Sequence, residues 1–225
     1  MTSNTKEPRQ ITASSLKKQL KEQTPTGDEQ HMIRLHRAIS WLQCAEDQKD
    51  NTDLQFISLW IAFNACYAGE NFSELTYTEK NRFQDFIHRL VHLDTESSFF
   101  DMLWVKFSGP IRLLMDNKYA FKQFWQAQRD TNIDWKKAFE RSKQICAYCL
   151  EDQDVSGMLT LVLDRLYTVR NQLMHGGATY KSRVNRSQVK DACQILSFLV
   201  PQIIEIMLRN LKEDWGDIRY PVISE

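Results

Sequence analysis

The chain of 225 residues has little glycine and little proline, with seven of the first and five of the second. Loop-rich β proteins use more of both at their turns, and no segment shows sustained alternation of apolar and polar residues. No run reaches the roughly 18 apolar residues that a membrane span needs. The first residues also lack the apolar core of a secretory signal. We therefore expect an all-α protein that is cytoplasmic and does not interact with a membrane.

Net charge is also absent, because 29 Lys and Arg residues balance 29 Asp and Glu residues. Hydrophobic residues make up 42% and aromatic residues 11%, a composition typical of a globular protein long enough to bury a sizeable core. We expect a helical domain over residues 28–214, with a flexible arm before it (1–27) and a tail after it (215–225). Residues 70–154 would form a helical insertion within that domain.

Apolar residues recur at three- and four-residue steps along most of this domain, and capping residues, glycine and proline divide it into helices. The expected helices cover residues 28–47, 52–68, 78–93, 96–107, 119–128, 135–151, 159–175 and 187–211, with a short basic helix over 14–23 in the arm. Gly109-Pro110 is expected to break the chain after 96–107, and Pro201 to kink the last helix. The sequence therefore predicts an all-α helical bundle with a helical insertion.

Motifs for metals and cofactors are incomplete. Cys146 and Cys149 form a C-x-x-C, but no second cysteine pair or histidine pair accompanies them. His88 and His92 are four residues apart on one helical face, again without a companion carboxylate or cysteine. Buried thiols and surface histidines are the better interpretation, so we expect no metal and no cofactor.

Two further classes of function lack their sequence signals. There is no G-x-x-x-x-G-K-[ST] loop and no paired-carboxylate motif for phosphoryl transfer from a nucleotide. There is also no compact helix-turn-helix unit for DNA recognition. The aromatic residues of the insertion would suit the stacking of nucleobases, but a stripe of this kind is more often core.

The stretch Leu159–Gly177 is the most informative part of the sequence. It combines an apolar helical stripe with a polar cluster near its end and a double-glycine stop. Asn171 and His175 are four residues apart and share a face, whereas Arg170 and His175 are five apart and diverge. Unpaired carbonyls in the last turn favour imidazolium, which suits His175 to general acid–base catalysis.

The charge around this stretch differs from that of the whole chain. From residue 165 to residue 190 there is no Asp or Glu. The same segment holds six basic residues, which are Arg165, Arg170, Lys181, Arg183, Arg186 and Lys190. The sequence therefore predicts a local cationic surface that attracts a polyanion such as RNA and weakens with salt.

Residues 170–175, Arg-Asn-Gln-Leu-Met-His, resemble the signature of HEPN domains (higher eukaryotes and prokaryotes nucleotide-binding), in which a polar residue follows an Arg and a His comes several residues later. The segment Leu59–Tyr67 is similar to an early core helix of that family, and a long apolar helix follows the motif. The resemblance covers about residues 30–69 and 155–211.

The resemblance implies a metal-independent endoribonuclease with its site between two protomers of a homodimer. The ribose 2′-OH would attack its own phosphorus and leave a 2′,3′-cyclic phosphate. His175 would be the general acid or base, Arg170 would stabilise the phosphate, and Asn171 would orient the imidazole or the phosphate. Asn64 is expected to be a buried polar residue that supports the motif helix. Further expected RNA contacts are Tyr167, Lys181, Arg183 and Arg186.

Other interpretations of the same residues stay open. His175 can be a helix-end histidine bonded to the last carbonyls, and Arg170 can form a surface ion pair with Asp164 or another acid. The alternative function is a non-catalytic, dimeric module of this fold that binds RNA, nucleotides or proteins. A third setting is a toxin or defence ribonuclease that an antitoxin or another regulatory protein holds inactive.

Overall fold

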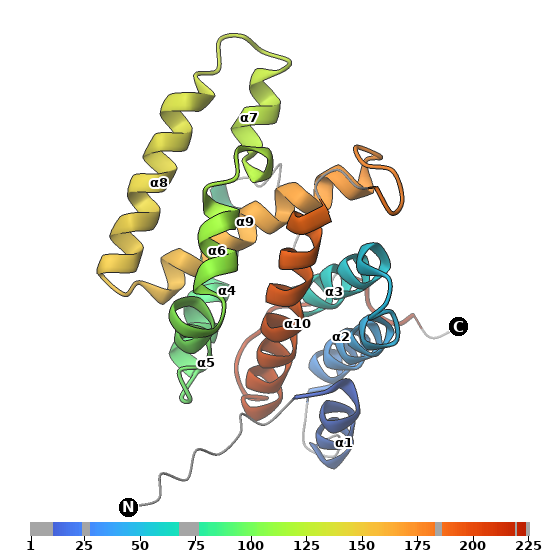
Figure 1. Cartoon of the computed structure of the whole chain (residues 1–225). Coiled ribbons are helices and arrows are strands. Elements are labelled where there is room, and N and C mark those ends of the chain that lie inside the picture. Colours follow the sequence, from blue (N-terminus) through green and yellow to red (C-terminus); the bar gives the residue numbers. More distant parts are fainter. Residues whose placement is uncertain (1–10, 24–27, 68–76, 183–185, 219, 224–225) are drawn as a thin grey trace, which may run out of the picture.

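The computed structural model describes residues 11–23, 28–67, 77–182, 186–218 and 220–223, and these residues form ten α-helices and no strand (Figure 1). The predicted all-α class is confirmed. The helices are α1 (Ala13–Gln23), α2 (Glu29–Asp47), α3 (Thr52–Tyr67), α4 (Tyr77–Leu93), α5 (Ser98–Phe100), α6 (Ser108–Met115), α7 (Lys122–Ala127), α8 (Trp135–Glu151), α9 (Val155–Met174) and α10 (Arg186–Arg209). A π-helix, η1 (Asp101–Lys106), and a 3₁₀ turn, η2 (Lys118–Ala120), join some of them.

Helix α3 lies at the centre of one half of the bundle. It packs against α2 and α10, and α1 packs against α2 and α10 in turn (Figure 1). Phe56 and Phe63 of α3 are fully buried, as expected for a helix that is apolar on nearly all sides. The short helix expected over 14–23 is confirmed as α1, but it packs on the bundle and is not part of a flexible arm, because Leu16 and Leu20 are buried in the same core.

Helix α9, which carries the 170–175 motif, forms the centre of the other half. It contacts α4, α6 and α8, and it also touches α3 and α10. Asp154 caps its first turn by accepting a hydrogen bond from the N–H of Gly157 (2.9 Å). Nine of its twenty residues are buried, so this helix joins the elements of the predicted insertion to the rest of the bundle.

The segment between α4 and α8 differs in detail from the sequence expectation. The single helix expected over 96–107 is short α5 followed by the π-helix η1, which ends at Lys106. Pro110 does follow a break, but it lies in the first turn of α6, where a missing N–H costs nothing. The helix expected over 119–128 is divided into η2 and α7, whereas α8 covers residues 135–151 as predicted, with Asp134 as its N-cap.

Helices α7 and α8 form a hairpin that projects from the bundle (Figure 1). Helix α7 has no buried residue. Helix α8 is held to α9 along one face, where Phe139, Cys146 and Cys149 are buried. The hairpin therefore depends on α8 and on the loop before α7 for its attachment to the motif helix.

The C-terminal segment after α10 returns across α2. Arg34 of α2 is 1% exposed, and its guanidinium donates to the backbone carbonyls of Trp215 and Gly216. The ring of His31 stacks on Trp215, with centroids 6.1 Å apart, and lies 3.3 Å from the Met207 carbonyl oxygen. Two polar side chains of α2 thus fix the start of the tail.

Helix α10 continues through Pro201, which is buried. By length and composition it is the one described helix that matches a membrane span, with 72% of its apolar window buried inside the structure. A buried core helix passes the same test, and Leu196, Leu199 and Ile203 of α10 are core residues here. The match is therefore weak support for a membrane span.

Candidate functional site

The motif lies where α9 ends, and two consecutive glycines shape this end. The N–H of Gly177 donates to the Gln172 carbonyl (2.7 Å), and the N–H of Gly176 donates to the Leu173 carbonyl (3.3 Å). These two bonds define a Schellman motif, with Gly176 at a φ of 69°. A Cβ on Gly177 would lie 2.9 Å from the Gln172 carbonyl oxygen, so both positions need glycine for different reasons.

His175 is the residue at which α9 ends. It is the C-cap, with a φ of −98° and a ψ of 18°, and its own N–H still donates to the Asn171 carbonyl. Its side chain is exposed, and its ring makes no hydrogen bond to the residues that the structure describes. The alternative interpretation, in which the His175 ring donates a hydrogen bond to the last helix carbonyls, is therefore wrong for this conformation.

Arg170 is partly buried and lacks a counter-ion within the described chain. Its Nη1 donates to Oδ1 of the neighbouring Asn171 (2.9 Å), which leaves the Asn171 amide NH₂ available as a donor. Its guanidinium carbon lies 5.8 Å from the centre of the Tyr167 ring, and its Nε is buried without a partner. The predicted alternative, an ion pair with Asp164, is wrong, because Asp164 pairs with Arg165 instead (3.4 Å).

A partly buried guanidinium without a carboxylate is uncommon, because buried charges are normally paired. One side of the Arg170 fork faces Asn171, and the rest of the fork can receive an anion such as a phosphate. At about 100° per residue, Arg170 and His175 lie roughly 140° apart around the helix. Within one chain, the Arg170 and His175 side chains therefore lie on different sides of the last turns of α9.

Two residues expected at the site differ from the expectation in their burial. Tyr167 was expected to contact RNA, but it is 5% exposed and its ring packs against Trp60 of α3, with centroids 5.9 Å apart. Asn64 was expected to be buried, but it is exposed, so it does not support α9 from within the core. Both expectations were wrong, because α3 and α9 are apolar around most of their circumference and periodicity does not identify the open side.

The predicted cationic surface is smaller than the sequence suggests. Arg165 is 1% exposed and donates to Ser142 Oγ of α8 (2.8 Å), with its guanidinium carbon 4.5 Å from the centre of the Phe121 ring. Arg186 is neutralised by Asp53. Lys181 and Lys190 are exposed, and Arg183 lies outside the described residues.

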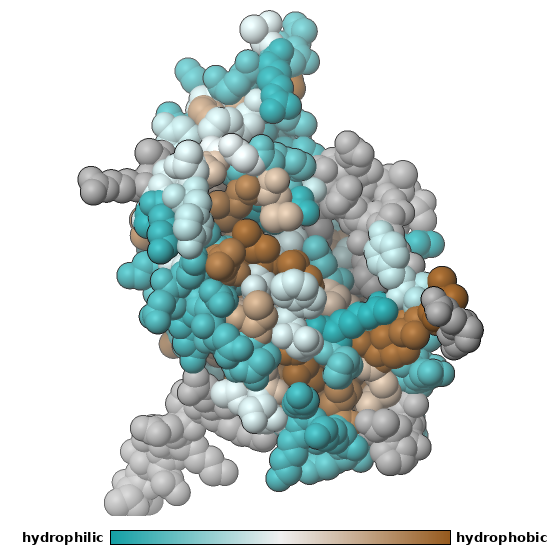
Figure 2. Space-filling view, turned by 90° about the vertical axis from the view of Figure 1, so that its right-hand side faces the viewer, coloured by the Kyte–Doolittle hydropathy of each residue, from teal (hydrophilic) through white to brown (hydrophobic). Residues whose placement is uncertain are grey.

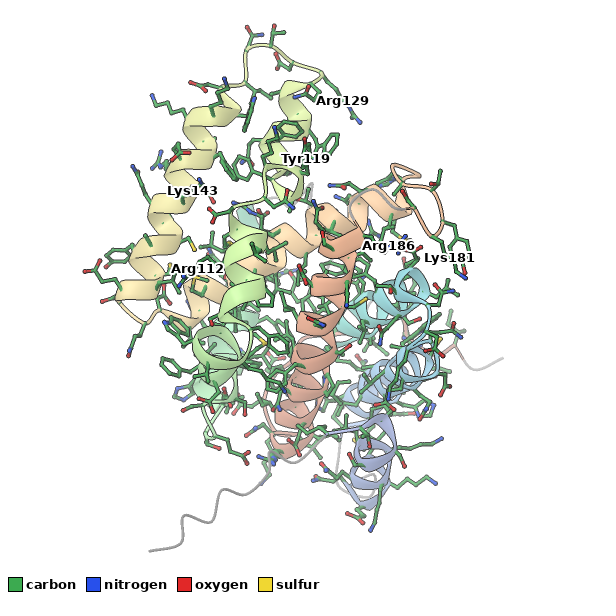
Figure 3. All side chains as sticks on the ribbon, viewed as in Figure 1. Arg112, Tyr119, Arg129, Lys143, Lys181 and Arg186 are labelled. Carbon is green, nitrogen blue, oxygen red and sulfur yellow. The ribbon has the colours of Figure 1, made fainter. Side chains whose placement is uncertain are left out.

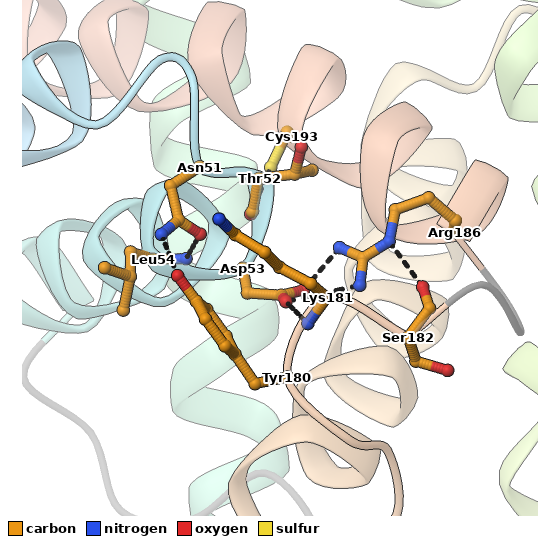
Figure 4. A network of polar contacts seen from close by, with 9 residues as sticks. All are labelled: Asn51, Thr52, Asp53, Leu54, Tyr180, Lys181, Ser182, Arg186 and Cys193. Carbon is orange, nitrogen blue, oxygen red and sulfur yellow. Dashed lines mark hydrogen bonds and ion pairs between the residues drawn. The ribbon is translucent and has the colours of Figure 1, made fainter.

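Asp53, in the first turn of α3, anchors the loop that follows the motif (Figure 4). Its two carboxylate oxygens accept from Arg186 Nη1 (2.6 Å) and Nη2 (3.2 Å), and Oδ2 also accepts from the backbone N–H of Lys181 (2.8 Å). Arg186 Nε donates to the Ser182 carbonyl (2.8 Å). Lys181 and Arg186, predicted as RNA contacts, thus serve first to hold the loop in place, although the Lys181 ammonium remains exposed.

This carboxylate is 4% exposed, and burial raises its pKa. The hydrogen bonds from Arg186 and from the Lys181 N–H outweigh burial, so the net pKa of Asp53 lies below its usual value. Nearby, Asn51 Nδ2 donates to the hydroxyl of Tyr180 (2.6 Å). Tyr180, Lys181 and Arg186 are therefore all held against the start of α3.

Comparison with protein-family models, with curated proteins and with solved structures found no match.

Two contacts at the motif were not foreseen from the sequence. Gln172 Nε2 donates to the Tyr119 carbonyl (2.6 Å), and Trp125 Nε1 donates to the same oxygen (2.8 Å). They link the α7–α8 hairpin to the middle of the motif. The only sequence signal was the aromatic density of residues 119–125, which does not indicate a partner 53 residues away.

The other polar clusters considered in the sequence do not form a metal site among the described residues. Cys146 and Cys149 are free buried thiols, and burial raises the pKa of both. His88 and His92 are exposed on α4. The cysteines are therefore buried thiols and the histidines are surface residues, as expected from the sequence.

Proposed function

We propose that this protein is a metal-independent endoribonuclease that cleaves RNA by attack of the ribose 2′-OH on the adjacent phosphorus. His175 moves the proton, Arg170 binds the phosphoryl oxygens, and the Asn171 amide orients the phosphate. The observation that carries the proposal is the Arg170 guanidinium, which is partly buried, has no carboxylate partner in the described chain and is bonded to Asn171. An anionic ligand would supply the missing partner.

The divergence of Arg170 and His175 around α9 supports a composite site formed by two chains. In a two-fold dimer with adjacent α9 helices, Arg170 of one protomer would face His175 of its partner. Side chains beside the motif favour such a contact, since Met174 is 49% exposed, Tyr180 is 62% exposed and Leu54 is 42% exposed. The loop and the start of α3 lie on the right of Figure 1, the side that Figure 2 turns to the viewer and on which hydrophobic side chains gather.

The test is cleavage of mixed RNA in EDTA by the wild type, Arg170→Ala and His175→Ala. Removal of a general acid–base group lowers such rates by roughly 10²–10⁴-fold. The expected result is cleavage that leaves 2′,3′-cyclic phosphate ends, at a rate lowered by that factor in His175→Ala and by roughly 10²–10³-fold in Arg170→Ala, which loses a donor to the developing charge. His88→Ala is the matched control, because His88 is also exposed but lies on α4. Equal cleavage by all four proteins would refute the assignment of Arg170 and His175 as catalytic residues.

Mixing the two inactive variants tests the composite site. If Arg170 and His175 act across the dimer, a mixed dimer keeps one intact site, and random exchange restores about a quarter of the wild-type activity. If both groups act within one chain, the mixture stays inactive, and the composite site is refuted while the nuclease assignment stands. Absence of cleavage together with RNA binding would instead favour the non-catalytic binding module.

A further inference from the structure

The α7–α8 hairpin exposes aromatic rings next to the motif. Tyr119 is 40% exposed and Trp125 is 39% exposed, with ring centroids 6.2 Å apart. Phe124 packs against both rings at 5.3 and 5.2 Å, and it is only partly buried. Since α7 has no buried residue, these rings are not needed to complete the core of the bundle. They form a surface of π-faces at the edge of the molecule.

The charge of this segment has one sign. Residues 117–129 contain Lys118, Lys122 and Arg129 but no Asp or Glu. The Lys118 ammonium lies 5.1 Å from the centre of the Tyr119 ring and 5.6 Å from that of Phe124. An aromatic surface edged by the Lys118 ammonium fits a ligand that combines flat rings with negative charge, as a single-stranded nucleic acid does.

The surface is fixed relative to the motif at two places. The Tyr119 carbonyl accepts from both Gln172 of α9 and the Trp125 indole, so one oxygen joins the motif to the exposed tryptophan. At the base of the hairpin, Arg165 of α9 holds Phe121 and Ser142. Figure 3 shows Tyr119 at the base of the hairpin beside α9 and Arg129 further along it.

We propose that Tyr119 and Trp125 form a stacking site for unpaired nucleobases of the RNA strand that binds at the motif. The identity of that strand rests on the proposed function. Bases in a duplex are already stacked on one another, so the surface selects single-stranded RNA or loops. Lys118 leaves the Tyr119 ring when a base arrives and pairs with the strand's phosphate.

The test measures binding in the His175→Ala background, so that cleavage does not consume the probe. The probe is a short, mixed-sequence, fluorescein-labelled single-stranded RNA, and its anisotropy is compared with that of the same sequence as a duplex. Stacking on one aromatic side chain is typically worth 1–3 kcal/mol, so Trp125→Ala should weaken single-strand affinity by roughly 5- to 150-fold. Trp125→Phe should retain most of the affinity, because a ring remains. The matched control is Trp41→Ala, since Trp41 of α2 is also 40% exposed but lies away from the hairpin.

Equal affinities of Trp125→Ala and Trp41→Ala would overturn the stacking site, as would an equal loss of duplex and single-strand binding. Loss of affinity in Trp125→Phe as large as in Trp125→Ala would show that the indole hydrogen bond, and not stacking, is what matters. The proposed function fails separately, through absence of cleavage in the wild type. Binding that depends on Trp125 and is selective for single-stranded RNA, without cleavage, would support the stacking site and refute the proposed nuclease activity. No RNA binding by any of these proteins would overturn the inference and point to a protein ligand for the hairpin.

Discussion

Replacement of Asp53 by Asn tests how the loop after the motif is held. The carboxylate accepts three charge-assisted bonds, two from Arg186 and one from the Lys181 N–H. Asn keeps the size and one acceptor oxygen. If that oxygen takes the place of Oδ2, the bond from Arg186 Nη1 is lost, and if it takes the place of Oδ1, the two bonds to Oδ2 are lost. At about 1.5–3 kcal/mol for each bond to a charged group, the loss of one or two bonds is about 1.5–6 kcal/mol. We expect a loss of about 3 kcal/mol or less, because the Arg186 side chain is 32% exposed and regains hydration.

The assay is urea unfolding followed by circular dichroism, applied to the wild type, Asp53→Asn, Arg186→Gln and the double variant. The double-mutant cycle isolates the interaction between the two side chains, and we expect a coupling of at least about 1 kcal/mol. The pKa of Asp53 is lowered in the folded protein. Its contribution is therefore fully present above the unfolded pKa of about 3.9 and disappears as the pH falls through the lower folded value. A coupling near zero at neutral pH, or a difference between wild type and Asp53→Asn that persists in acid, would refute the reasoning.

Two further predictions concern the helix end and the tail. Gly176→Ala should lower the free energy of unfolding by about 1 kcal/mol through its positive φ, and Gly177→Ala by about 1–3 kcal/mol through contact with the Gln172 carbonyl. Gly109→Ala, with open space and an ordinary φ, should be neutral or slightly stabilising in the same urea titration, and equal losses in all three would contradict this explanation. Burial lowers the pKa of His31, so the folded protein should lose stability as the pH falls below about 6.5, where the unfolded chain takes up the proton. Unfolding midpoints measured along a pH series should show a weaker decline in His31→Gln than in the control His88→Gln, and identical declines would exclude His31 as the cause.

The helices and the end of the motif helix could be predicted from the sequence, because the signals are local. Gly176-Gly177 predicts the helix stop that the Schellman motif forms, and α8 begins at Trp135 as predicted, with Asp134 as its N-cap. Hydrogen-bond partners three to five residues apart decide both features. Apolar periodicity also predicts α2, α3, α9 and α10 to within a few residues, since each buries a long stripe.

The surroundings of the site could not be predicted in the same way. Tyr167 was expected at the surface because it precedes the motif by one turn, but α9 is buried on several sides and the ring meets Trp60. Arg165 and Arg186 were expected to form a free cationic surface, yet their partners, Ser142 and Asp53, lie 23 and 133 residues away. Hydropathy gives the number of apolar faces on a helix, but the identity of each neighbour depends on the tertiary arrangement.

The contact of Arg34 with the tail affects the order in which the chain can fold as it is made. The two carbonyls that receive this guanidinium belong to residues 181 and 182 positions further along the chain. Until they emerge, a cation that ends up 1% exposed has no acceptor, and enclosing it would cost several kcal/mol. Helices α1–α3, although they are synthesised first, are therefore unable to close their part of the core early. Most of the chain must leave the ribosome before the first third of the sequence reaches its final packing.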